Sequence, residues 1–394
     1  MPVYGIIKRK YRKKKTMYDF KEVEENLTRM VREGKIAGAS AAVYLAGSPV
    51  FEVCCGYADL EKKIALSPKS VFRLASMTKP VTAAAVLICR ERGWLALEDP
   101  VSRYLPAFQD TFLAEKKRGH YERGRKNPVP VTVLHLLTHS SGIGSGEPVA
   151  DFYCEAKPRE GDTLAAAVQR YADFPLEFIP GTAQSYSPVM ALDVAARIVE
   201  IVSGMPYAAF LEKNIFLPLG MRNTGYSRAA FAPGNIVVSY RHEDGRLLRD
   251  PLEEHNFDDF PADYPGGGAG LMATAEDYAR FASMLACMGE LDGVRILQRE
   301  SVGLMQKPWL PQSVAGITDW FNWGLGVRTL SKTIPGQPLA PGSFGWSGAY
   351  GTHFWAEPAR RLAAVYMHNS LTYGGAGAPH MNLFEEGVMR ALGR

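Results

Sequence analysis

The chain has 394 residues, of which 46% are hydrophobic and 22% are charged, a composition that excludes a disordered chain, a collagen-like repeat and a peptide-sized scaffold. No stretch reaches the ~18 uninterrupted apolar residues of a membrane-spanning helix, so we expect no membrane association. The net charge of +4 belongs to one segment, because residues 8–15 contribute seven cations; without them the 45 basic residues fall to 38, fewer than the 41 acidic ones.

That basic segment lies in a predicted flexible arm, residues 1–17. A cationic arm can bind nucleic acid or anionic lipid. Because neither an aromatic platform nor a basic groove accompanies it, we interpret it as a solvated tail and expect no nucleic-acid partner. The first 30 residues lack the apolar core of a secretory signal, and five cysteines are too few for a disulfide framework. We therefore expect a cytoplasmic protein.

The first hundred residues predict a helix, a hairpin and a second helix. Asp19 begins the first helix, with Glu22 as a capping partner. Two β-favouring runs, 39–46 and 50–57, flank a Gly-Ser-Pro turn and predict an antiparallel hairpin. The second helix is expected over about residues 76–92.

The middle of the chain is mostly helical in pattern. Residues 106–131 are polar and rich in Lys and Arg, and predict a long surface loop. Residues 234–265 are acidic and show no clear period. Apolar residues recur at helical spacing in four segments: 133–138, 163–173, 189–203 and 206–213.

The last third begins with a glycine run at 266–270. A helix is expected to follow it, with Thr274 as its N-cap and Asp277 at the third position. Further along the chain the pattern predicts strands over 324–329, 351–355 and 362–368, and a closing helix over 382–392.

Strands at both ends and helices between them predict an α/β fold of the α+β kind. The hairpin near the N-terminus would pair with the C-terminal strands in one antiparallel sheet flanked by helices, with a mostly helical domain inserted. We place the α/β domain at residues 18–100 and 266–394 and the helical domain at residues 101–265.

The segment richest in chemistry is Ser76-Met-Thr-Lys79, at the start of the second predicted helix. Residues three apart share a helix face, so the Lys79 ammonium can approach the Ser76 hydroxyl. A helix N-terminus adds exposed N–H groups that favour developing negative charge. This arrangement suits an activated serine nucleophile. The pattern is short and by itself weak, since it arises by chance about once in a chain of this length.

Other candidates are weaker. Ser347 lies in Gly-Trp-Ser-Gly-Ala, one residue short of the Gly-x-Ser-x-Gly nucleophile elbow, but only 47 residues follow it, too few for the fold that carries that elbow. His135 and His139 could share a helix face, yet they lack a third ligand, so we expect no metal site. The run 266–270 does not match a dinucleotide-binding loop, and no cofactor is expected.

Five segments together resemble the serine β-lactamases and penicillin-binding enzymes, and within them most closely the class C-like esterases called family VIII carboxylesterases. The resemblance spans about residues 20–390, in order and at compatible spacing, which makes it specific although each motif alone is not. It rests on Ser-x-x-Lys at 76–79, Leu-Leu-Thr-His-Ser-Ser-Gly at 136–142, Pro-Gly-Thr at 180–182 leading into Ser-Tyr-Ser at 185–187, Gly-Ala-Gly-Leu at 268–271 with Thr-Ala-Glu-Asp-Tyr at 274–278, and Gly-Trp-Ser-Gly at 345–348 with Gly-Thr-His-Phe-Trp at 351–355.

The resemblance implies a β-lactamase-like fold and a role for each matching residue. Ser76 corresponds to the nucleophile, Lys79 to its partner and Tyr186 to the tyrosine of the second motif. The backbone N–H groups of Ser76 and Ala349 would form the oxyanion hole. The third motif, and with it the substrate-binding strand, would be Trp346, Ser347 and Gly348.

Those roles make chemical sense together. A phenol is protonated at neutral pH, and only its ionised form can act as a base. A nearby cation favours that ionised form, and Lys79 would supply the cation. Tyr186 could then take the Ser76 proton as Ser76 attacks a carbonyl, and return it to the leaving alcohol. The two oxyanion donors would stabilise the tetrahedral intermediate.

Two departures from the β-lactamase pattern narrow the expected substrate. Pro188 stands where those enzymes have an asparagine, so the side-chain amide that would bond a substrate amide is missing. Trp346 stands where they have a lysine, and an indole cannot pair with a substrate carboxylate. It offers an apolar surface instead. We therefore expect an esterase acting on short, uncharged carboxylic esters, with the small ester as its partner.

Several alternatives remain open at this point. The chain could be a β-lactamase or a D-amino-acid peptidase-type amidase, an acyltransferase of the same fold, or a binding protein that has lost turnover. The physiological ester, its acyl chain length, the stereochemical preference and the oligomeric state are not predicted.

Overall fold

The two ends of the chain meet in one antiparallel sheet, as the sequence predicts. The computed structural model describes residues 6–7, 18–375 and 377–393. In it β18 (Leu362–His368) pairs along its full length with β2 (Gly38–Leu45). The nine-stranded sheet runs β1-β3-β2-β18-β17-β16-β15-β14, with β4 paired to β3 off this path. Its other strands are β1 (Ile6–Ile7), β3 (Ser48–Asp59), β4 (Ile64–Ala65), β14 (Phe321–Trp323), β15 (Arg328–Leu330), β16 (Phe344–Gly348) and β17 (Thr352–Glu357).

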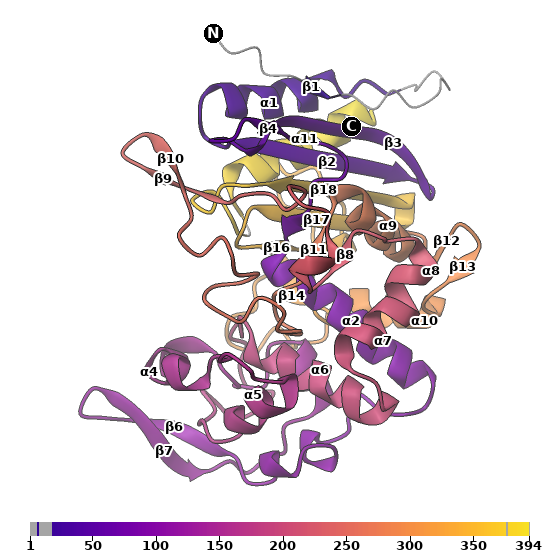
Figure 1. Ribbon diagram of the computed structural model, residues 1–394. Coiled ribbons are helices and arrows are strands. Elements are labelled where there is room, and N and C mark those ends of the chain that lie inside the picture. The colour runs from indigo at the N-terminus through magenta and orange to yellow at the C-terminus, as the bar shows by residue number, and fades with distance from the viewer. Residues whose placement is uncertain (1–5, 8–17, 376, 394) are drawn as a thin grey trace.

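Helices cover both faces of this sheet, which explains why β18 is buried at all seven positions. The helices α1 (Lys21–Arg32) and α11 (Pro379–Ala391) pack on one face, around Trp355 and Tyr366. The helix α9 (Ala275–Ala286) packs on the opposite face, and α2 (Thr78–Glu91) lies beyond it in the larger core (Figure 1).

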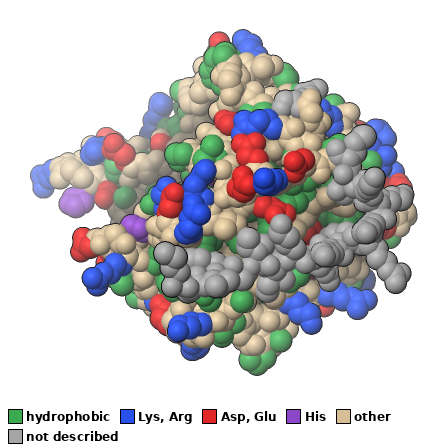
Figure 2. Space-filling view, turned by 90° about the horizontal axis from the view of Figure 1, so that it is seen from above, with side chains coloured by type: hydrophobic (Ala, Val, Ile, Leu, Met, Phe, Trp, Pro, Cys, Tyr) green, Lys and Arg blue, Asp and Glu red, His purple; other side chains and the backbone are tan. Residues whose placement is uncertain are grey.

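The helix α1 begins two residues later than predicted. The Asp19 carboxylate accepts the Lys21 N–H at 3.0 Å, so Asp19 does bond the first turn. Glu22 is not its capping partner; it pairs with Arg390 of α11 and ties the two helices together. The exposed surface of α1 carries both signs of charge, and Figure 2 shows Lys and Arg interspersed with Asp and Glu on this side of the molecule.

A second group of elements lies below the sheet in Figure 1. The four helices predicted there from periodicity are present as α3 (Val133–Leu137), α5 (Leu164–Tyr171), α6 (Met190–Ser203) and α7 (Tyr207–Leu211). A fifth, α4 (Gly146–Ala156), was not predicted. The predicted boundaries between an α/β and a helical domain stay a prediction.

Two predictions about loops and strands are wrong. Residues 106–131 are not one long loop, because β6 (Phe112–Lys117) and β7 (His120–Lys126) form a hairpin there. Both strands are mostly exposed, so no apolar alternation marks them in the sequence. The strand predicted over 324–329 instead spans the turn between β14 and β15, where Gly326 has a φ of +65°.

The remaining elements are short or peripheral. The predicted arm contributes Ile6 and Ile7 to β1, paired with Cys55 and Cys54, while its basic run 8–15 lies outside the described residues. Among the described residues no single helix has the length and apolarity that a membrane crossing needs, although one bent pair, α6 with residues 207–219, meets that test by length and composition. The other elements are β5 (Phe72–Arg73), α8 (Leu217–Leu219), β8 (Thr224–Gly225), β9 (Tyr240–Glu243), β10 (Arg246–Arg249), β11 (Met272–Ala273), β12 (Glu290–Leu291), β13 (Val294–Arg295), α10 (Arg299–Gln306) and several 3₁₀ or π turns.

Candidate active site

Ser76 lies in the single turn η1 (Ala75–Met77), which leads directly into α2. The residue before it, Ala75, is fully buried and has a φ of +46°, in the left-handed region that side chains rarely adopt. Such strain persists only where the surroundings enforce it. Here the Leu74 N–H donates to the Leu271 carbonyl at 2.9 Å, and the Tyr278 hydroxyl donates to the Met77 carbonyl at 2.7 Å. The strained turn is thus held on both sides of Ser76.

Lys79 follows one turn later and is wholly buried. Its ammonium donates to Ser76 Oγ at 3.1 Å, to the Pro188 carbonyl at 2.5 Å and to the Gly268 carbonyl at 2.8 Å. An ammonium has three N–H donors, so these three acceptors use all of them and fix its position. Pro188, which lacks the amide of a β-lactamase asparagine, contributes its backbone oxygen instead.

Tyr186 reaches the same serine from the other side. Its hydroxyl donates to Ser76 Oγ at 2.7 Å, and the Lys79 ammonium lies 4.9 Å from the centre of its ring. The backbone around Tyr186 is held by His139, whose carbonyl accepts the Ser185 N–H at 3.0 Å and whose Nδ1 accepts the Ser187 N–H at 3.1 Å. Burial, with a smaller contribution from Lys79, holds the pKa of His139 well below its usual range. A neutral imidazole is what an acceptor at Nδ1 requires.

Trp346 takes part in this polar network. Its indole N–H donates to the Tyr186 oxygen at 3.1 Å. Its ring lies 4.7 Å from that of Trp323, which in turn packs on His139 and Tyr186. The sequence assigned Trp346 an apolar surface only; the structure adds a hydrogen-bond donor to the phenol.

The end of β16 closes over the Ser76 turn. A Cβ on Gly348 would lie 2.1 Å from the Leu74 carbonyl oxygen, so only glycine allows this close approach. The Thr352 hydroxyl donates to the same carbonyl at 3.0 Å. Ala349 follows Gly348 immediately in the chain. Its pairing with Ser76 as an oxyanion hole remains a prediction.

The backbone of the glycine run 266–270 accepts hydrogen bonds from side chains of α2. Its carbonyls accept from Lys79 at Gly268 and from Thr82 at Gly267. The Gly268 N–H donates to the buried Asp193 at 2.9 Å, and burial raises the pKa of that carboxyl to about 6. A Cβ on Gly267 would lie 2.2 Å from the Leu192 carbonyl oxygen, so the run packs tightly on α6. The run is therefore a structural support for the lysine.

Proteins similar to this chain are known both by sequence and by fold. Residues 23–383 match the Beta-lactamase family model. The chain belongs to the Beta-lactamase family. It is 33% identical over 329 residues to Protein Rv1367c of Mycobacterium tuberculosis, covering 79% of this chain and 80% of that protein, and 32% identical over 382 residues to Esterase EstB of Burkholderia gladioli, covering 88% and 89%. The solved structure of EstCE1, described as a hydrolase with promiscuous acyltransferase activity, superposes with a TM-score of 0.79 at 24% identity, covering 94% of this chain and 98% of that one.

As a Beta-lactamase family member the protein is a serine hydrolase of the β-lactamase and penicillin-binding superfamily, with that superfamily's mixed fold. The structure brings together Ser76, Lys79, Tyr186 and Trp346, which the sequence proposed for the site. It also adds residues that the sequence did not single out for this role, namely Asp193, Pro188 through its carbonyl, and His139 through its contacts with residues 185 and 187.

Ser347 points elsewhere. Successive side chains of a strand face opposite sides of the sheet, so Ser347 faces away from Trp346. Its hydroxyl meets His353 Nδ1 at 2.8 Å on β17, and His353 Nε2 meets Glu385 of α11 at 3.0 Å. The sequence proposed Ser347 for substrate binding beside Ser76, whereas its hydrogen bond lies on the α11 face.

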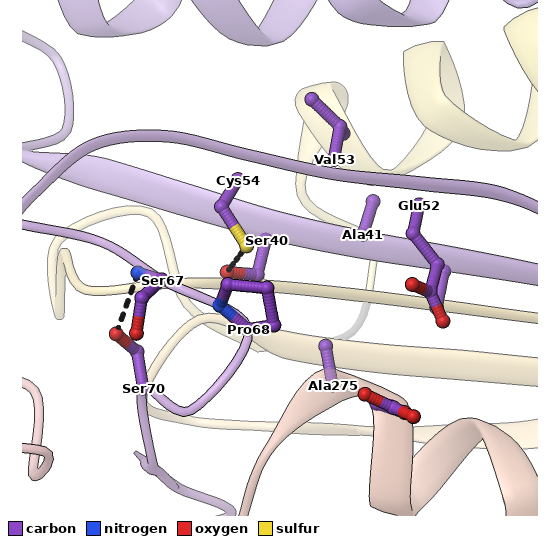
Figure 3. A pocket seen from close by; sticks show the side chains of 11 residues that line it. Ser40, Ala41, Glu52, Val53, Cys54, Ser67, Pro68, Ser70 and Ala275 are labelled. Carbon is purple, nitrogen blue, oxygen red and sulfur yellow. Dashed lines mark hydrogen bonds between the residues drawn. The ribbon is translucent and has the colours of Figure 1, made fainter. Parts of the chain in front are cut away.

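The other candidates lie outside the Ser76 hydrogen-bond network. His135 Nδ1 accepts the Thr132 N–H at the start of α3, away from the bonds of His139, and among the described residues no group of three or more His, Cys, Asp or Glu is placed to hold a metal ion. Figure 3 shows a small pocket between β2, β3 and the start of α9, where Ser40 bonds Cys54. Its volume of about 20 Å³ holds one water molecule, and the described residues that line it include no histidine or lysine.

Proposed function

We propose that the protein is a carboxylesterase that hydrolyses short-chain esters through an acyl-enzyme on Ser76. The observation that carries the proposal is the hydrogen-bonded set in which Ser76 Oγ lies 2.7 Å from the Tyr186 oxygen and 3.1 Å from the Lys79 ammonium. A nucleophile and a base within hydrogen-bond reach, with the base oriented by further groups, are the requirements of covalent acyl transfer.

In the proposed mechanism Tyr186 acts in its phenolate form, with the phenol proton already released to solvent, and accepts the Ser76 proton as Ser76 Oγ bonds to the ester carbonyl carbon. The Trp346 N–H donates to the Tyr186 oxygen, and the Lys79 ammonium lies 4.9 Å from the centre of the Tyr186 ring, so both favour the negative charge of the phenolate. The proton then passes to the leaving alcohol as the ester bond breaks. Water attacks the acyl-enzyme by the same route in reverse, and the backbone N–H groups of Ser76 and Ala349 would stabilise both tetrahedral intermediates.

The choice of an ester over an amide rests on the departures at positions 188 and 346. Pro188 gives its only polar group, the carbonyl, to Lys79 and therefore has no donor for a substrate amide. The indole N–H of Trp346 donates to Tyr186 and is therefore not available to a substrate amide. The 32% identity with Esterase EstB supports the same choice.

The proposal is tested by hydrolysis of p-nitrophenyl butyrate. We expect Ser76→Ala to lower kcat/KM at least a thousandfold, because the covalent route is lost. Ser70→Ala is the matched control and should retain activity, since Ser70 is also buried and its hydroxyl accepts the Ser67 N–H, away from the Ser76 network. Equal rates for wild type and Ser76→Ala would falsify the mechanism.

A second candidate is acyl transfer to an alcohol, the activity named for EstCE1. The two reactions share the acyl-enzyme and differ only in whether water or an alcohol resolves it. Adding butanol to the p-nitrophenyl butyrate assay distinguishes them. Butyl butyrate formed in excess of butyric acid would assign the protein to the transferases.

A further inference from the structure

A second cavity borders α11, and Trp346, whose indole N–H bonds Tyr186 at the Ser76 site, is one of the residues that line it. It has a volume of about 260 Å³ and is bounded by β15, β16, β17 and α11. Arg328, Ser347, His353 and Glu385 supply its polar groups, and Phe321 and Trp355 are among its aromatic ones. None of these side chains has a part in the Ser76 mechanism.

Three of the polar side chains form a continuous relay. Ser347 and His353 face each other across the β16–β17 ladder, which fixes their separation, and Ser347 Oγ lies 2.8 Å from His353 Nδ1. His353 Nε2 lies 3.0 Å from Glu385 Oε1, one of the inward positions of α11. The two partners are only 12% and 11% exposed, so water does not weaken their bond as it would on the surface.

The relay has the proton arrangement of a serine nucleophile with its base. A carboxylate is an acceptor only, so the Nε2 proton of His353 points to Glu385. That leaves the Nδ1 lone pair for the Ser347 hydroxyl proton. Nucleophile, base and orienting carboxylate are recognised by this geometry of roles and not by their order in the chain.

Arg328 supplies a cation in the same cavity. Its guanidinium lies 3.9 Å from the centre of the Phe321 ring and 5.8 Å from that of Trp346. Within the described part of the chain it makes no hydrogen bond or close ion pair, and its charge is balanced only at longer range by Glu385 in the same cavity. A sheltered cation without a bonded acceptor can stabilise negative charge that develops on a ligand.

We propose that Ser347, His353 and Glu385 form a second acylation site, independent of Ser76, that accepts small aryl esters of short carboxylic acids. The Ser347 oxygen bonds to the ester carbonyl carbon, its proton moves to His353 Nδ1, and the carbonyl oxygen carries the negative charge beside Arg328. The carbon–oxygen bond to the phenol then breaks, and the phenolate takes the proton from His353. The aromatic walls favour an aryl leaving group, and the cavity volume limits its size.

The test removes the first site and asks where a small acyl donor reacts. Ser76→Ala is incubated with p-nitrophenyl acetate, trapped with acid, digested and analysed by peptide mass. We expect acetylation of Ser347 in this background. His353→Gln added to it should slow that acetylation at least tenfold, because the base is lost.

Ser343→Ala is the matched control, because Ser343 lines the same cavity but its hydroxyl has no partner in the described structure. It should leave acetylation of Ser347 unchanged, and Ser343 itself should stay unmodified. If His353→Gln lowers the melting temperature too far to be assayed, Glu385→Gln tests the base instead, because it removes the carboxylate that orients His353. The proposal is overturned if Ser347 stays unmodified in folded Ser76→Ala, or if the rate is unaffected by both relay variants. If Ser76 stays unmodified in the wild type, the proposed esterase mechanism is refuted. That outcome does not affect the Ser347 proposal, which is tested in the Ser76→Ala background.

Discussion

At the scale of single residues, the site depends on polar groups whose partners are far apart in the sequence. Lys79 is fully buried, and a buried cation is stable only where its hydrogen bonds are complete. Two of its three acceptors are backbone carbonyls, of Pro188 and Gly268. A carbonyl carries no signature of residue type, so the sequence could pair Lys79 with Ser76 but could not give the rest of its environment.

The hydrogen bond from Trp346 to Tyr186 makes a prediction at this scale. Trp346→Phe keeps an aromatic ring but removes the N–H that lies 3.1 Å from the Tyr186 oxygen. We expect kcat for p-nitrophenyl butyrate to fall about tenfold, the worth of one hydrogen bond to a charged group, with KM changed less.

Trp323→Phe is the control for that variant. Trp323 packs on the same tyrosine, but its indole N–H lies 2.9 Å from the side-chain amide of Gln184. Its kcat should fall less than threefold. Equal losses in the two variants would mean that ring packing, and not the N–H, is what Tyr186 needs.

At the scale of elements, the close approach of β16 to η1 depends on Gly348. A methyl group there would meet the Leu74 oxygen at 2.1 Å and the Thr352 hydroxyl at 2.3 Å, so the strand must move away from the Ser76 turn. We expect Gly348→Ala to lower kcat/KM at least a hundredfold and to lower the melting temperature by several degrees.

Gly303→Ala provides the opposite case. Gly303 lies inside α10, and a Cβ there would meet no atom within 4 Å. Alanine should raise the free energy of unfolding by about 0.5–1 kcal/mol, because glycine loses more backbone entropy in a helix. Activity should stay at the wild-type level, and thermal melting with the esterase assay measures both variants together.

Local signals predicted some elements and missed others: the sequence pattern did not predict β16, although Phe344, Ser347 and Gly348 are buried in it. The strand at 362–368 and the N-cap bond from Asp277 to Thr274 are confirmed as predicted, because apolar residues and capping chemistry are local signals. The hairpin at 112–126 was missed because it buries neither face. Likewise the relay of Ser347, His353 and Glu385 spans two strands and a helix, so no local sequence pattern predicts it.

At the scale of the whole molecule, the buried Asp193 links stability to pH. Burial raises the pKa of Asp193 from 3.8 to about 6. Between about pH 4 and pH 6 the folded protein therefore holds a proton that the unfolded chain releases. The contribution of Asp193 to stability falls as pH rises through this window, by up to about 3 kcal/mol, and is constant above it.

Asp193→Asn removes this contribution. The difference in free energy of unfolding between wild type and variant, measured by urea denaturation from pH 4 to pH 8, should shift in favour of the variant up to about pH 6 and then level off. A difference that does not vary with pH would show that Asp193 titrates alike in the folded and unfolded states.

The pairing of β18 with β2 also bears on how the protein is made. Leu45 and Leu362 are neighbours in the ladder, yet the ribosome adds Leu362 roughly 15 to 60 seconds after Leu45 at ordinary rates of translation. During that interval β2 has no partner on the side that β18 will occupy. Its unpaired backbone and apolar faces are the kind of surface that chaperones shield on nascent chains. The ribosome must therefore synthesise β16 and β18 before β16 can pack on the turn that carries Ser76. The nascent protein is then inactive and forms its active site only near the end of translation.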